Sequence, residues 1–378
     1  MKFIHTADWH LGRSFHEKNL VEDQKAALEQ FVDLVREEKP DVVLVAGDIY
    51  DRSVPAVDAV RLLDEVLNEI VLHLKVPLAM IAGNHDSPGR LAFGSELYKD
   101  QGLSVAGLST RKVEISDRHG AVDIYLIPYA RPEEARAAGL KLKDNTHDSA
   151  LAAQIQECSG GKVSARSIVV AHAFVADCEE SESERLLSVG GAGTVSADHF
   201  NGYGYTALGH LHRPQQIRDN VQYSGSLLKY SFSEVDHIKG VVVGEMDARG
   251  KVSTRFVELA PRHEVRIVEG LFADLLKPAG AKATREDYIE FRLLDKGPVL
   301  NAMIRLREIF PNALSVRRPE IEMRNDSSMA GVDRHKISHA DLFESFFLDV
   351  VGEPLTVKEK TALEEILEEV QTEEEVAS

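Results

Sequence analysis

Short apolar runs of strand character recur along the first half of the chain, and amphipathic stretches separate the first three of them. The apolar runs are residues 3–7, 42–46, 78–82, 124–127, 168–171 and 205–208. Residues 21–38 and 57–72 carry apolar side chains at i, i+3 and i+4 spacing, which predicts helices that bury one face. The alternation of strand and helix predicts β-α-β units and a sheet that helices cover.

The pattern changes after Gly209 to strands joined by turns, at residues 221–224, 240–246 and 252–259. We expect these later strands to form a second sheet that completes a sandwich with the first. The first domain then ends near Ala260 and Pro261, so that it spans residues 1–261.

Residues 262–325 predict a second, smaller α/β unit. We expect strands and helices there at residues 263–268, 271–276, 288–293, 299–310 and 314–316, the second and fourth of these being the helices. This unit holds twelve basic and ten acidic side chains. Its basic residues include a sequence cluster of Arg305, Arg307, Arg317 and Arg318.

The last part of the chain has the composition of a linker at residues 326–340, followed by two amphipathic helical patterns in residues 341–378. Gly352 and Pro354 separate the two patterns, as expected where a helix ends. Their apolar positions include Phe343, Phe346 and Phe347 in the first helix, and Leu363, Ile366 and Leu367 in the second. Such a tail either binds a partner or folds back on its own domain as a hairpin.

The composition is that of an ordinary soluble protein, with 378 residues, 43% hydrophobic and 28% charged. This length allows two domains and an appendage. We find no secretory signal at the start and no apolar run long enough to cross a bilayer, so we expect a cytoplasmic protein. Cys158 and Cys178 form no CxxC pair, which argues against a disulfide framework or a thiolate metal site.

Five clusters rich in histidine and aspartate carry the candidate chemistry, and nearly every one directly follows an apolar run. They are Asp8-Trp9-His10, Gly47-Asp48-Ile49-Tyr50-Asp51, Gly83-Asn84-His85-Asp86, Ala171-His172-Ala173 and Gly209-His210-Leu211-His212. In β-α-β folds, side chains beyond the carboxyl ends of strands converge on one rim. Chance explains one such tripeptide more readily than five in order. The carboxylate, imidazole and amide ligands suit Mn²⁺, Fe²⁺ or Zn²⁺ at a site for two metal ions.

The formal net charge of −18 opposes binding to a phosphate backbone, because nonspecific binding of nucleic acid rests on lysine and arginine. The charge is unevenly distributed, however. Residues 341–378 hold twelve acidic and two basic side chains, a net of −10, which leaves −8 for residues 1–340. Part of that remainder is the ligand set, which two divalent cations would offset. The acidic total therefore weakens a nucleic-acid interpretation without excluding it.

The five clusters together resemble the signature of the calcineurin-like metallophosphoesterases: Asp-x-His, Gly-Asp-x-x-Asp, Gly-Asn-His-Asp, a lone histidine and Gly-His-x-His. The segments HTADWHLGR, VLVAGDIYDR, AGNHDSPGR and YTALGHLHRPQ are similar, more specifically, to the nuclease subunits of bacterial double-strand-break repair complexes. The resemblance implies a four-layer α-β-β-α sandwich, a small α/β capping domain that binds DNA and a helical tail that binds a partner.

The resemblance also implies roles for the residues of the clusters. One metal ion would be bound by Asp8, His10, Asp48 and His212, and the other by Asp48, Asn84, His172 and His210. Mn²⁺ is favoured over Mg²⁺, Fe²⁺ or Zn²⁺. His85 would donate a proton to the leaving oxygen, with Asp86 orienting its ring. Asp51 replaces a histidine of archaeal and eukaryotic relatives, so that a transition-state role there is in doubt.

Arginines near the clusters are candidates for holding backbone phosphates. Arg13, Arg52 and Arg90 each follow a metal motif closely, and a guanidinium group can hold a phosphate bidentately. The alternative for any one of them is a solvated loop arginine. In the capping domain, Arg317 and Arg318 are the preferred phosphate contacts, whereas Arg305 and Arg307 fit the solvated face of a helix.

The activity that the resemblance implies is 3′ to 5′ exonuclease action on duplex DNA and endonuclease action on single strands and hairpins. The tail helices would bind the coiled coil of an ATPase partner, and the subunit would be a homodimer within a heterotetramer that acts in DNA repair, recombination and replication. As a dimer, the subunit would grip two ends through exposed helices of the first domain, around residues 57–72. The alternatives are a small-molecule or cyclic-nucleotide phosphodiesterase, and a non-catalytic scaffold for DNA ends.

Overall fold

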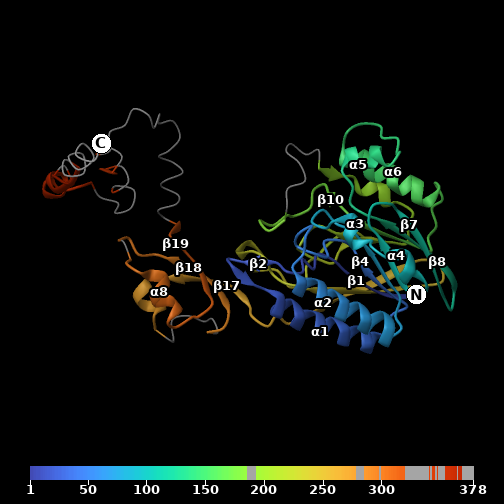
Figure 1. The fold of residues 1–378 in the computed structure, drawn as a ribbon, viewed down its shortest axis with the longest axis horizontal. Coiled ribbons are helices and arrows are strands. Elements are labelled where there is room, and N and C mark those ends of the chain that lie inside the picture. The colour runs from blue at the N-terminus through green and yellow to red at the C-terminus, as the bar shows by residue number, and fades with distance from the viewer. Residues whose placement is uncertain are drawn as a thin grey trace. The chain divides into compact units, whose positions relative to one another are not determined.

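The computed structural model describes residues 1–184, 193–277, 285–297 and 299–319, together with residues 340, 343, 344, 347, 354–363 and 365–367 of the tail. Two compact units make up the chain, Met1–Arg262 and His263–Ser378 (Figure 1). Among the helices described, none is long and apolar enough to pass through a bilayer. The predicted linker, apart from its last residue, and Phe346 lie outside the described residues.

The first sheet of unit 1 has six strands in the order β16-β15-β1-β4-β5-β6. They are β1 Lys2–Thr6, β4 Val42–Val45, β5 Leu78–Ile81, β6 Leu103–Ala106, β15 Gly240–Met246 and β16 Val252–Glu258. The four strands from β1 to β6 run parallel, whereas β15 and β16 add antiparallel at one edge. Strands β4 and β5 are buried at every residue, as is typical of a parallel sheet covered on both faces.

The second sheet also has six strands, in the order β13-β14-β12-β9-β8-β7. They are β7 Arg111–Asp117, β8 Gly120–Ile127, β9 Ser167–His172, β12 Tyr205–Gly209, β13 Gln215–Arg218 and β14 Val221–Tyr223. Strands β8, β9, β12 and β14 run parallel, and the two edge strands are antiparallel to their neighbours.

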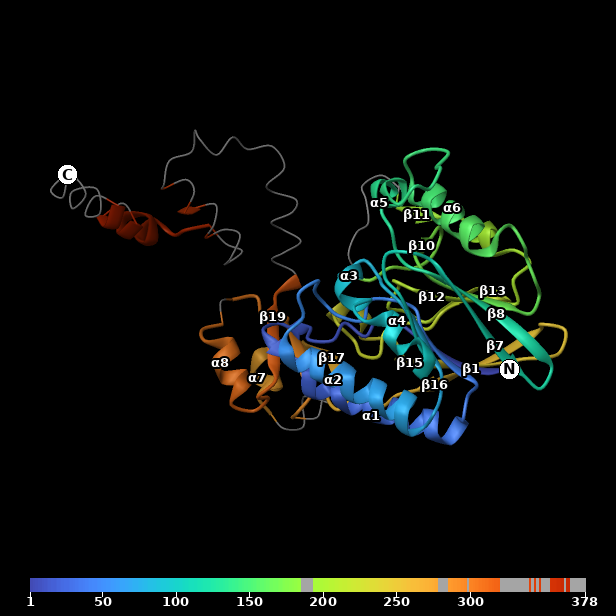
Figure 2. The ribbon, with the colours of Figure 1, turned by 45° about the vertical axis from the view of Figure 1, so that its right-hand side comes forward.

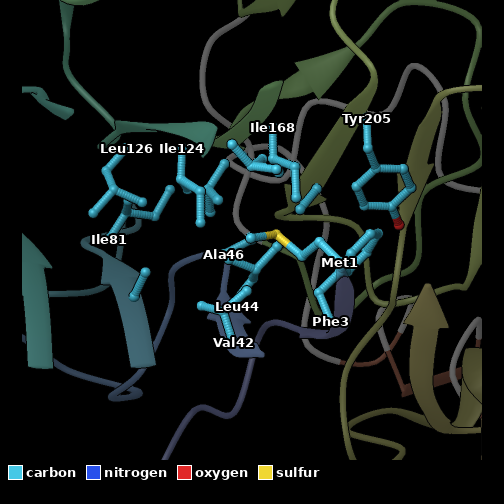
Figure 3. Packing of buried hydrophobic residues seen from close by; sticks show 14 of the residues in the cluster. Met1, Phe3, Val42, Leu44, Ala46, Ile81, Ile124, Leu126, Ile168 and Tyr205 are labelled. Atoms are coloured by element: carbon cyan, nitrogen blue, oxygen red, sulfur yellow. The ribbon is translucent and has the colours of Figure 1, made fainter. Parts of the chain in front are cut away.

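The two sheets pack face to face over a core of fully buried side chains (Figure 3). Side chains two residues apart point to the same face of a strand. Every second residue of the first sheet, including Phe3, Val42 and Leu44, therefore faces the second sheet and packs against its inward-facing side chains. The labelled residues of the second sheet are Ile124, Leu126, Ile168 and Tyr205. Burial of each large apolar side chain stabilises the sandwich by about 1.5–3 kcal/mol.

Helices cover the outer faces of both sheets (Figures 1 and 2). Helices α1 Val21–Glu38 and α2 Val57–Leu67 lie on the first sheet, and α5 Pro132–Ala137 and α6 His147–Ser159 lie on the second. The predicted four-layer α-β-β-α architecture is therefore confirmed. The remaining elements of this unit are short: β2 Ser14–Phe15, β3 Lys18–Asn19, π-helix η1 Asn68–His73, α3 Pro88–Leu91, α4 Ser95–Tyr98, η2 Lys99–Gln101, β10 Phe174–Val175, β11 Thr194–Val195, η3 Ala197–Phe200 and η4 Phe232–Glu234.

Two expectations about this unit are corrected. The strands after Gly209 do not build the second sheet by themselves, because β15 pairs antiparallel with β1 and thereby extends the first sheet together with β16. Gly244 of β15 lies opposite Phe3, where a Cβ would come within 2.1 Å of the phenyl ring. The helix predicted over residues 57–72 ends as an α-helix at Leu67 and continues as a π-helix.

Unit 2 contains a parallel sheet in the order β17-β18-β19, formed by β17 Val265–Gly270, β18 Tyr288–Leu293 and β19 Ala313–Arg317. Helices α7 Phe272–Leu275 and α8 Ala302–Arg307 pack on it through a buried cluster that includes Phe291 and Leu306. In the tail, Thr356 and Glu359 form a capping box at the start of the helical residues 357–363.

Candidate metal centre

The five clusters of the sequence meet at the carboxyl ends of strands from both sheets. Asp8 and His10 follow β1, Asp48 follows β4, Asn84 and His85 follow β5, His172 ends β9, and His210 and His212 follow β12. Their side chains are mostly buried, with exposed fractions of 0–4% for Asp8, His10, Asp48, His172, His210 and His212. The strand-end rule thus brings together residues that lie up to 204 positions apart in the sequence.

The backbone at these strand ends is strained. Asp8, His10, Asp48 and His210 have φ angles of 53°, 45°, 49° and 109°, in the region that residues other than glycine seldom adopt. Such strain persists where surrounding structure enforces it, and it gathers at functional sites. The glycine of the Gly-Asp motif is required as well, because a Cβ on Gly47 would lie 2.5 Å from Nδ1 of His172.

The first group of potential ligands is Asp8, His10 and His212, whose ligand atoms all lie within 4.8 Å of one another. Nε2 of His10 lies 3.0 Å from Nε2 of His212 and 3.7 Å from Oδ2 of Asp48. Two imidazole lone pairs repel at 3.0 Å, so either a proton or a cation must lie between them. The group therefore fits a metal ion.

The second group contains Asp48, Asn84, His172 and His210. Oδ1 of Asn84 lies 2.9 Å from Nε2 of His172 and 3.1 Å from Nδ1 of His210. Oδ2 of Asp48 lies 3.5 Å from Nε2 of His172 and also faces His10 of the first group. The backbone orients two of these residues, because Nδ1 of His172 is 2.9 Å from the carbonyl oxygen of Ala46 and the His210 N–H donates to Asp8.

The charges of the site favour bound cations. Burial lowers the pKa of the imidazoles of His10, His172, His210 and His212, which keeps their lone pairs free for a metal ion. Burial and then the neighbouring Asp48 raise the pKa of Asp8 well above its usual range. Among the described residues, neither Asp8 nor Asp48 forms an ion pair with a lysine or arginine. Two divalent cations would supply the missing positive charge.

His85 lies beside the potential ligands and is half-buried. Its ring centroid lies 4.7 Å from that of His10, and its backbone N–H donates to Asp48 Oδ1 at 2.8 Å. Nδ1 of His85 is 2.8 Å from the carbonyl oxygen of Asp51. Donation of the Nδ1 proton to that carbonyl leaves Nε2 free to face a substrate.

The expectation that Asp86 orients the His85 ring is wrong. The Asp86 carboxylate accepts hydrogen bonds from the backbone N–H groups of Ile49, Tyr50 and Gly83, so it joins the loops after β4 and β5. Burial and then Asp48 raise the pKa of Asp86 to about 7. The group that orients the ring is the backbone carbonyl of Asp51 instead.

Asp51 has a further place in the site that its sequence motif did not reveal. Its carboxylate lies 3.7 Å from Nδ1 of His10 and 3.3 Å from the Arg13 guanidinium. It also belongs to a third cluster of potential ligand atoms, with His10 and His85. The side chain thus connects the first ligand group to the loop that holds Arg13.

The arginines predicted to bind phosphates near the metal centre differ in their exposure and in the protein contacts that their guanidinium groups already make. Arg13 is 15% exposed, donates to the carbonyl oxygen of Ser183 at 2.9 Å and lies over the Tyr230 ring. Arg52 is 76% exposed, 3.5 Å from Asp51. Arg90 is exposed and donates to the carbonyl oxygen of Ser53. Arg13 is therefore committed to protein contacts, whereas Arg52 keeps its guanidinium largely in solvent.

In unit 2, the arginines predicted to contact phosphates both lie at the end of β19. Arg317 is exposed. Arg318 is half-buried and donates to the carbonyl oxygens of Asp295 and Gly297. Part of the Arg318 guanidinium is thus used in fixing the loop after β18.

A polar cluster behind His212 is absent from the sequence prediction. Four residues outside the five motifs contact His212 directly or through a neighbour: Ser183, Glu184, Glu234 at the end of η4, and Lys239. In the sequence, Glu234 and Lys239 look like residues of an ordinary surface loop. No pattern signal could have found them, because their burial depends on the loop after β14 folding onto the site.

Comparison with known protein families shows which family models and relatives this chain matches. Residues 1–214 match the family model described as calcineurin-like phosphoesterase, and residues 261–350 match the one described as type 5 capsule protein repressor C-terminal domain. Two curated relatives are both named as the SbcD subunit of the nuclease SbcCD. That of Staphylococcus saprophyticus is 33% identical over 377 residues, covering 97% of this chain and 98% of the relative. That of Staphylococcus epidermidis is 30% identical over 371 residues, with the same coverage.

Similar solved structures include TT1561 of Thermus thermophilus, at 15% identity and a TM-score of 0.37 over 68% of this chain and 98% of the other. A dimetal phosphatase from Danio rerio has 15% identity and a TM-score of 0.40, covering 69% of this chain and 99% of the other.

The sandwich, the ligand groups at its strand ends and the match over residues 1–214 define the class of protein: the chain belongs to the calcineurin-like metallophosphoesterases. Within that class, the alignments over 97% of the chain show that it belongs to the family of the SbcD subunits of the nuclease SbcCD. The chain is accordingly a metal-dependent phosphodiesterase of nuclease type.

Proposed function

We propose that this chain is the nuclease subunit of an SbcC–SbcD-type complex and cleaves DNA with two divalent metal ions. Its activities are 3′ to 5′ exonuclease action on duplex ends and endonuclease action on hairpins and single strands, in DNA repair, recombination and replication. The observation that carries the proposal is the convergence of two ligand groups around Asp48, whose Oδ2 faces both His10 and His172.

In this proposal Asp8, His10, Asp48 and His212 bind one ion, and Asp48, Asn84, His172 and His210 bind the other. Neutral imidazoles and buried carboxylates without a lysine or arginine partner among the described residues support this assignment. Two such ions lower the pKa of a bound water and neutralise phosphate oxygens. Mn²⁺ is the ion that the family resemblance favours, and oxygen and imidazole ligands without thiolate suit Mn²⁺, Fe²⁺ or Zn²⁺.

His85 is the proposed proton donor to the leaving oxygen. Its position next to His10 and the hydrogen bond from its Nδ1 to the Asp51 carbonyl support this role, because they fix the ring while its other nitrogen stays free of the ligand groups. The Asp51 carbonyl oxygen orients the His85 ring, and the Asp86 carboxylate holds the backbone of the loops after β4 and β5.

The proposed DNA contacts are divided between the units. Arg52 has a largely exposed guanidinium beside the metal centre, and Arg317 is an exposed residue of unit 2. Arg90 and Arg318 can add contacts only with the guanidinium nitrogens that their carbonyl partners leave free. Arg13 is the weakest candidate because its guanidinium already contacts Ser183, Asp51 and Tyr230.

The proposed partner of the tail is the coiled coil of an SbcC-like ATPase, within a heterotetramer that contains two copies of this chain. Phe343 and Ile366 are 42% and 58% exposed, which supports a helical surface that a partner helix can cover. Leu363 is buried, and the rings of Phe343 and Phe347 stack on each other. Phe346 and Leu367 belong to the same proposed surface.

The variant His85→Ala tests the catalytic proposal. The full-length variant should bind Mn²⁺ within about twofold of the wild-type affinity, because His85 is outside the ligand set, yet lose at least about 10²-fold in cleavage of hairpin DNA. Blunt, hairpin and single-stranded DNA should be compared with Mn²⁺, Mg²⁺ and Zn²⁺, with and without the ATPase partner. Undiminished cleavage by His85→Ala would sink the proposed role, and hydrolysis of cyclic nucleotides without cleavage of DNA would favour a small-molecule phosphodiesterase.

A further inference from the structure

A buried network of polar groups lies behind His212, on the side away from His10. Nδ1 of His212 is 2.6 Å from Oγ of Ser183 and 3.3 Å from Oε1 of Glu234. The Ser183 hydroxyl donates to the same Oε1 of Glu234. Glu234 is fully buried, and its other oxygen forms an ion pair at 2.5 Å with Lys239, which is 5% exposed.

The donors in this network determine the tautomer of His212. The Glu234 carboxylate can only accept, and the single hydroxyl proton of Ser183 is used in the bond to Glu234. The Ser183 oxygen must therefore accept the proton of the His212 Nδ1–H group. With the proton on Nδ1, the lone pair lies on Nε2, the atom that faces His10 at 3.0 Å within the first ligand group.

The same network also fixes the backbone of His212. Nζ of Lys239 donates to the His212 carbonyl oxygen at 2.7 Å and to Oγ of the buried Ser226 at 2.9 Å. The His212 N–H donates to Oε1 of Glu184 at 2.6 Å. The ring and both backbone polar groups of this one residue are thus held by side chains from two other loops.

A role in stability alone does not explain this arrangement. A buried ion pair is weak evidence for stability, since the cost of removing two charges from water often exceeds the gain from their attraction. The Glu234–Lys239 pair is almost wholly buried, and both of its members point at His212. Carboxylates that orient a metal-binding histidine act in this way in many metalloproteins.

We propose that Ser183, Glu234 and Lys239 are positioning residues for His212, which hold its Nδ1–H tautomer so that Nε2 is aimed at the first metal ion. This inference rests on the proposed metal centre. It assigns Arg13 a role too, because its bond to the Ser183 carbonyl places the Ser183 hydroxyl beside the ring. Lys239 balances the charge of Glu234, so this ion pair orients the ligand without adding net charge to the site.

The test is titration of the metal-free full-length chain with MnCl₂ by calorimetry, with thermal unfolding of the same samples. Ser183→Ala removes the hydroxyl and should lower the affinity for one of the two Mn²⁺ ions by about tenfold. The melting temperature of the metal-free chain should stay unchanged. Ser183→Thr keeps the hydroxyl and should restore the affinity to within about twofold of wild type.

Ser233→Ala is the matched control. The Ser233 hydroxyl accepts the N–H of Glu182, the neighbour of Ser183 in the chain. The Ser233 side chain is exposed, however, and no contact with His212 is present among the described residues. Its Mn²⁺ affinity should equal that of wild type. A loss in Ser233→Ala as large as in Ser183→Ala would show that only loop anchoring matters and would overturn the proposal.

The double variant Glu234→Gln/Lys239→Met replaces the ion pair with neutral groups of similar size. It should lower the affinity for the same Mn²⁺ ion by about 10–100-fold, while the metal-free protein keeps or gains stability. Unchanged Mn²⁺ affinity in both Ser183→Ala and the double variant would overturn the inference. Absence of two bound Mn²⁺ ions in the wild-type chain would instead overturn the metal centre itself, so the two failures are distinguishable.

Discussion

Asp8 shows how the site concentrates unfavourable energy in single residues. Its carboxylate is fully buried, its backbone has a φ of 53°, and its pKa is raised well above the usual range by burial and by Asp48. Each of these features costs free energy in the absence of a cation. In the proposed metal centre a bound cation would offset the buried charge, and such an exchange of stability for function is typical of active sites.

Asp8→Asn should therefore separate stability from metal binding. The neutral amide removes a buried charge, so the metal-free variant should gain about 1–2 kcal/mol in free energy of unfolding at pH 7. The rise in melting temperature that Mn²⁺ causes in the wild-type chain should be much smaller in the variant. Urea unfolding with and without Mn²⁺ measures both effects, and a less stable metal-free variant would contradict the account.

The buried residue His5 makes the stability of the folded chain depend on pH. Its fully buried ring lies 3.0 Å from the Tyr205 hydroxyl and 3.1 Å from the Leu208 carbonyl oxygen, and burial lowers its pKa to about 3. The unfolded chain, with a histidine pKa near 6.5, then binds more protons than the folded chain between pH 3 and 6.5. In that window stability falls as the pH falls, by at most about 1.4 kcal/mol per pH unit from this residue.

His5→Gln removes this titration and keeps polar atoms at the position. The variant should be less stable than wild type at pH 7.5, and the difference should shrink or reverse as the pH is lowered to 5. Urea unfolding of both metal-free proteins at several pH values isolates the contribution of His5, since all other histidines are common to the two. A stability difference that does not vary with pH would show that His5 is not held neutral.

At the scale of elements, strand β15, which lies between β16 and β1, illustrates what the sequence can and cannot predict. Its bounds, Gly240–Met246, agree with the apolar run of the sequence, because Val241, Val242 and Val243 favour a buried strand. Its partner was predicted wrongly, because pairing depends on β15 returning across the sandwich to β1. The register leaves Gly244 opposite Phe3, where no other side chain fits.

Gly244→Ala tests this pairing. The added methyl group would overlap the Phe3 ring, so the variant should lose about 1–3 kcal/mol in free energy of unfolding. Gly89→Ala is the control, because a Cβ there meets nothing within 4 Å and its effect should stay within about 0.5 kcal/mol. Equal stability of the two variants in urea unfolding would argue against the close approach of β15 to Phe3.

Elements missed in the sequence share a physical reason. Strand β7 alternates half-buried and exposed residues at a sheet edge, and it contains Arg111, Lys112 and Glu114 among its few apolar positions. Helix α6 buries polar residues, Ser149 and Gln154, along with Leu151 and Ile155. Weak patterns of this kind gain their structure from tertiary packing, so that neither the period nor the composition of the segment identifies it.

At the scale of the whole molecule, the convergence of the candidate ligand residues could be predicted because a short motif fixes each of them to a strand end. Two sheets packed face to face then place β1, β4 and β5 beside β9 and β12 at one rim. The network behind His212 could not be predicted, since Ser183 and Glu234 meet only after separate loops have folded over the site.

The most direct measurement of the central claim is the number of Mn²⁺ ions bound by the metal-free full-length chain, together with cleavage of hairpin DNA by the same samples. Wild type should bind two ions and cleave. Asp48→Asn should lose both ions and at least about 10²-fold in cleavage while remaining folded, because Asp48 faces both ligand groups. Retention of two bound ions by Asp48→Asn, or cleavage by wild type with fewer than two ions bound, would contradict the account.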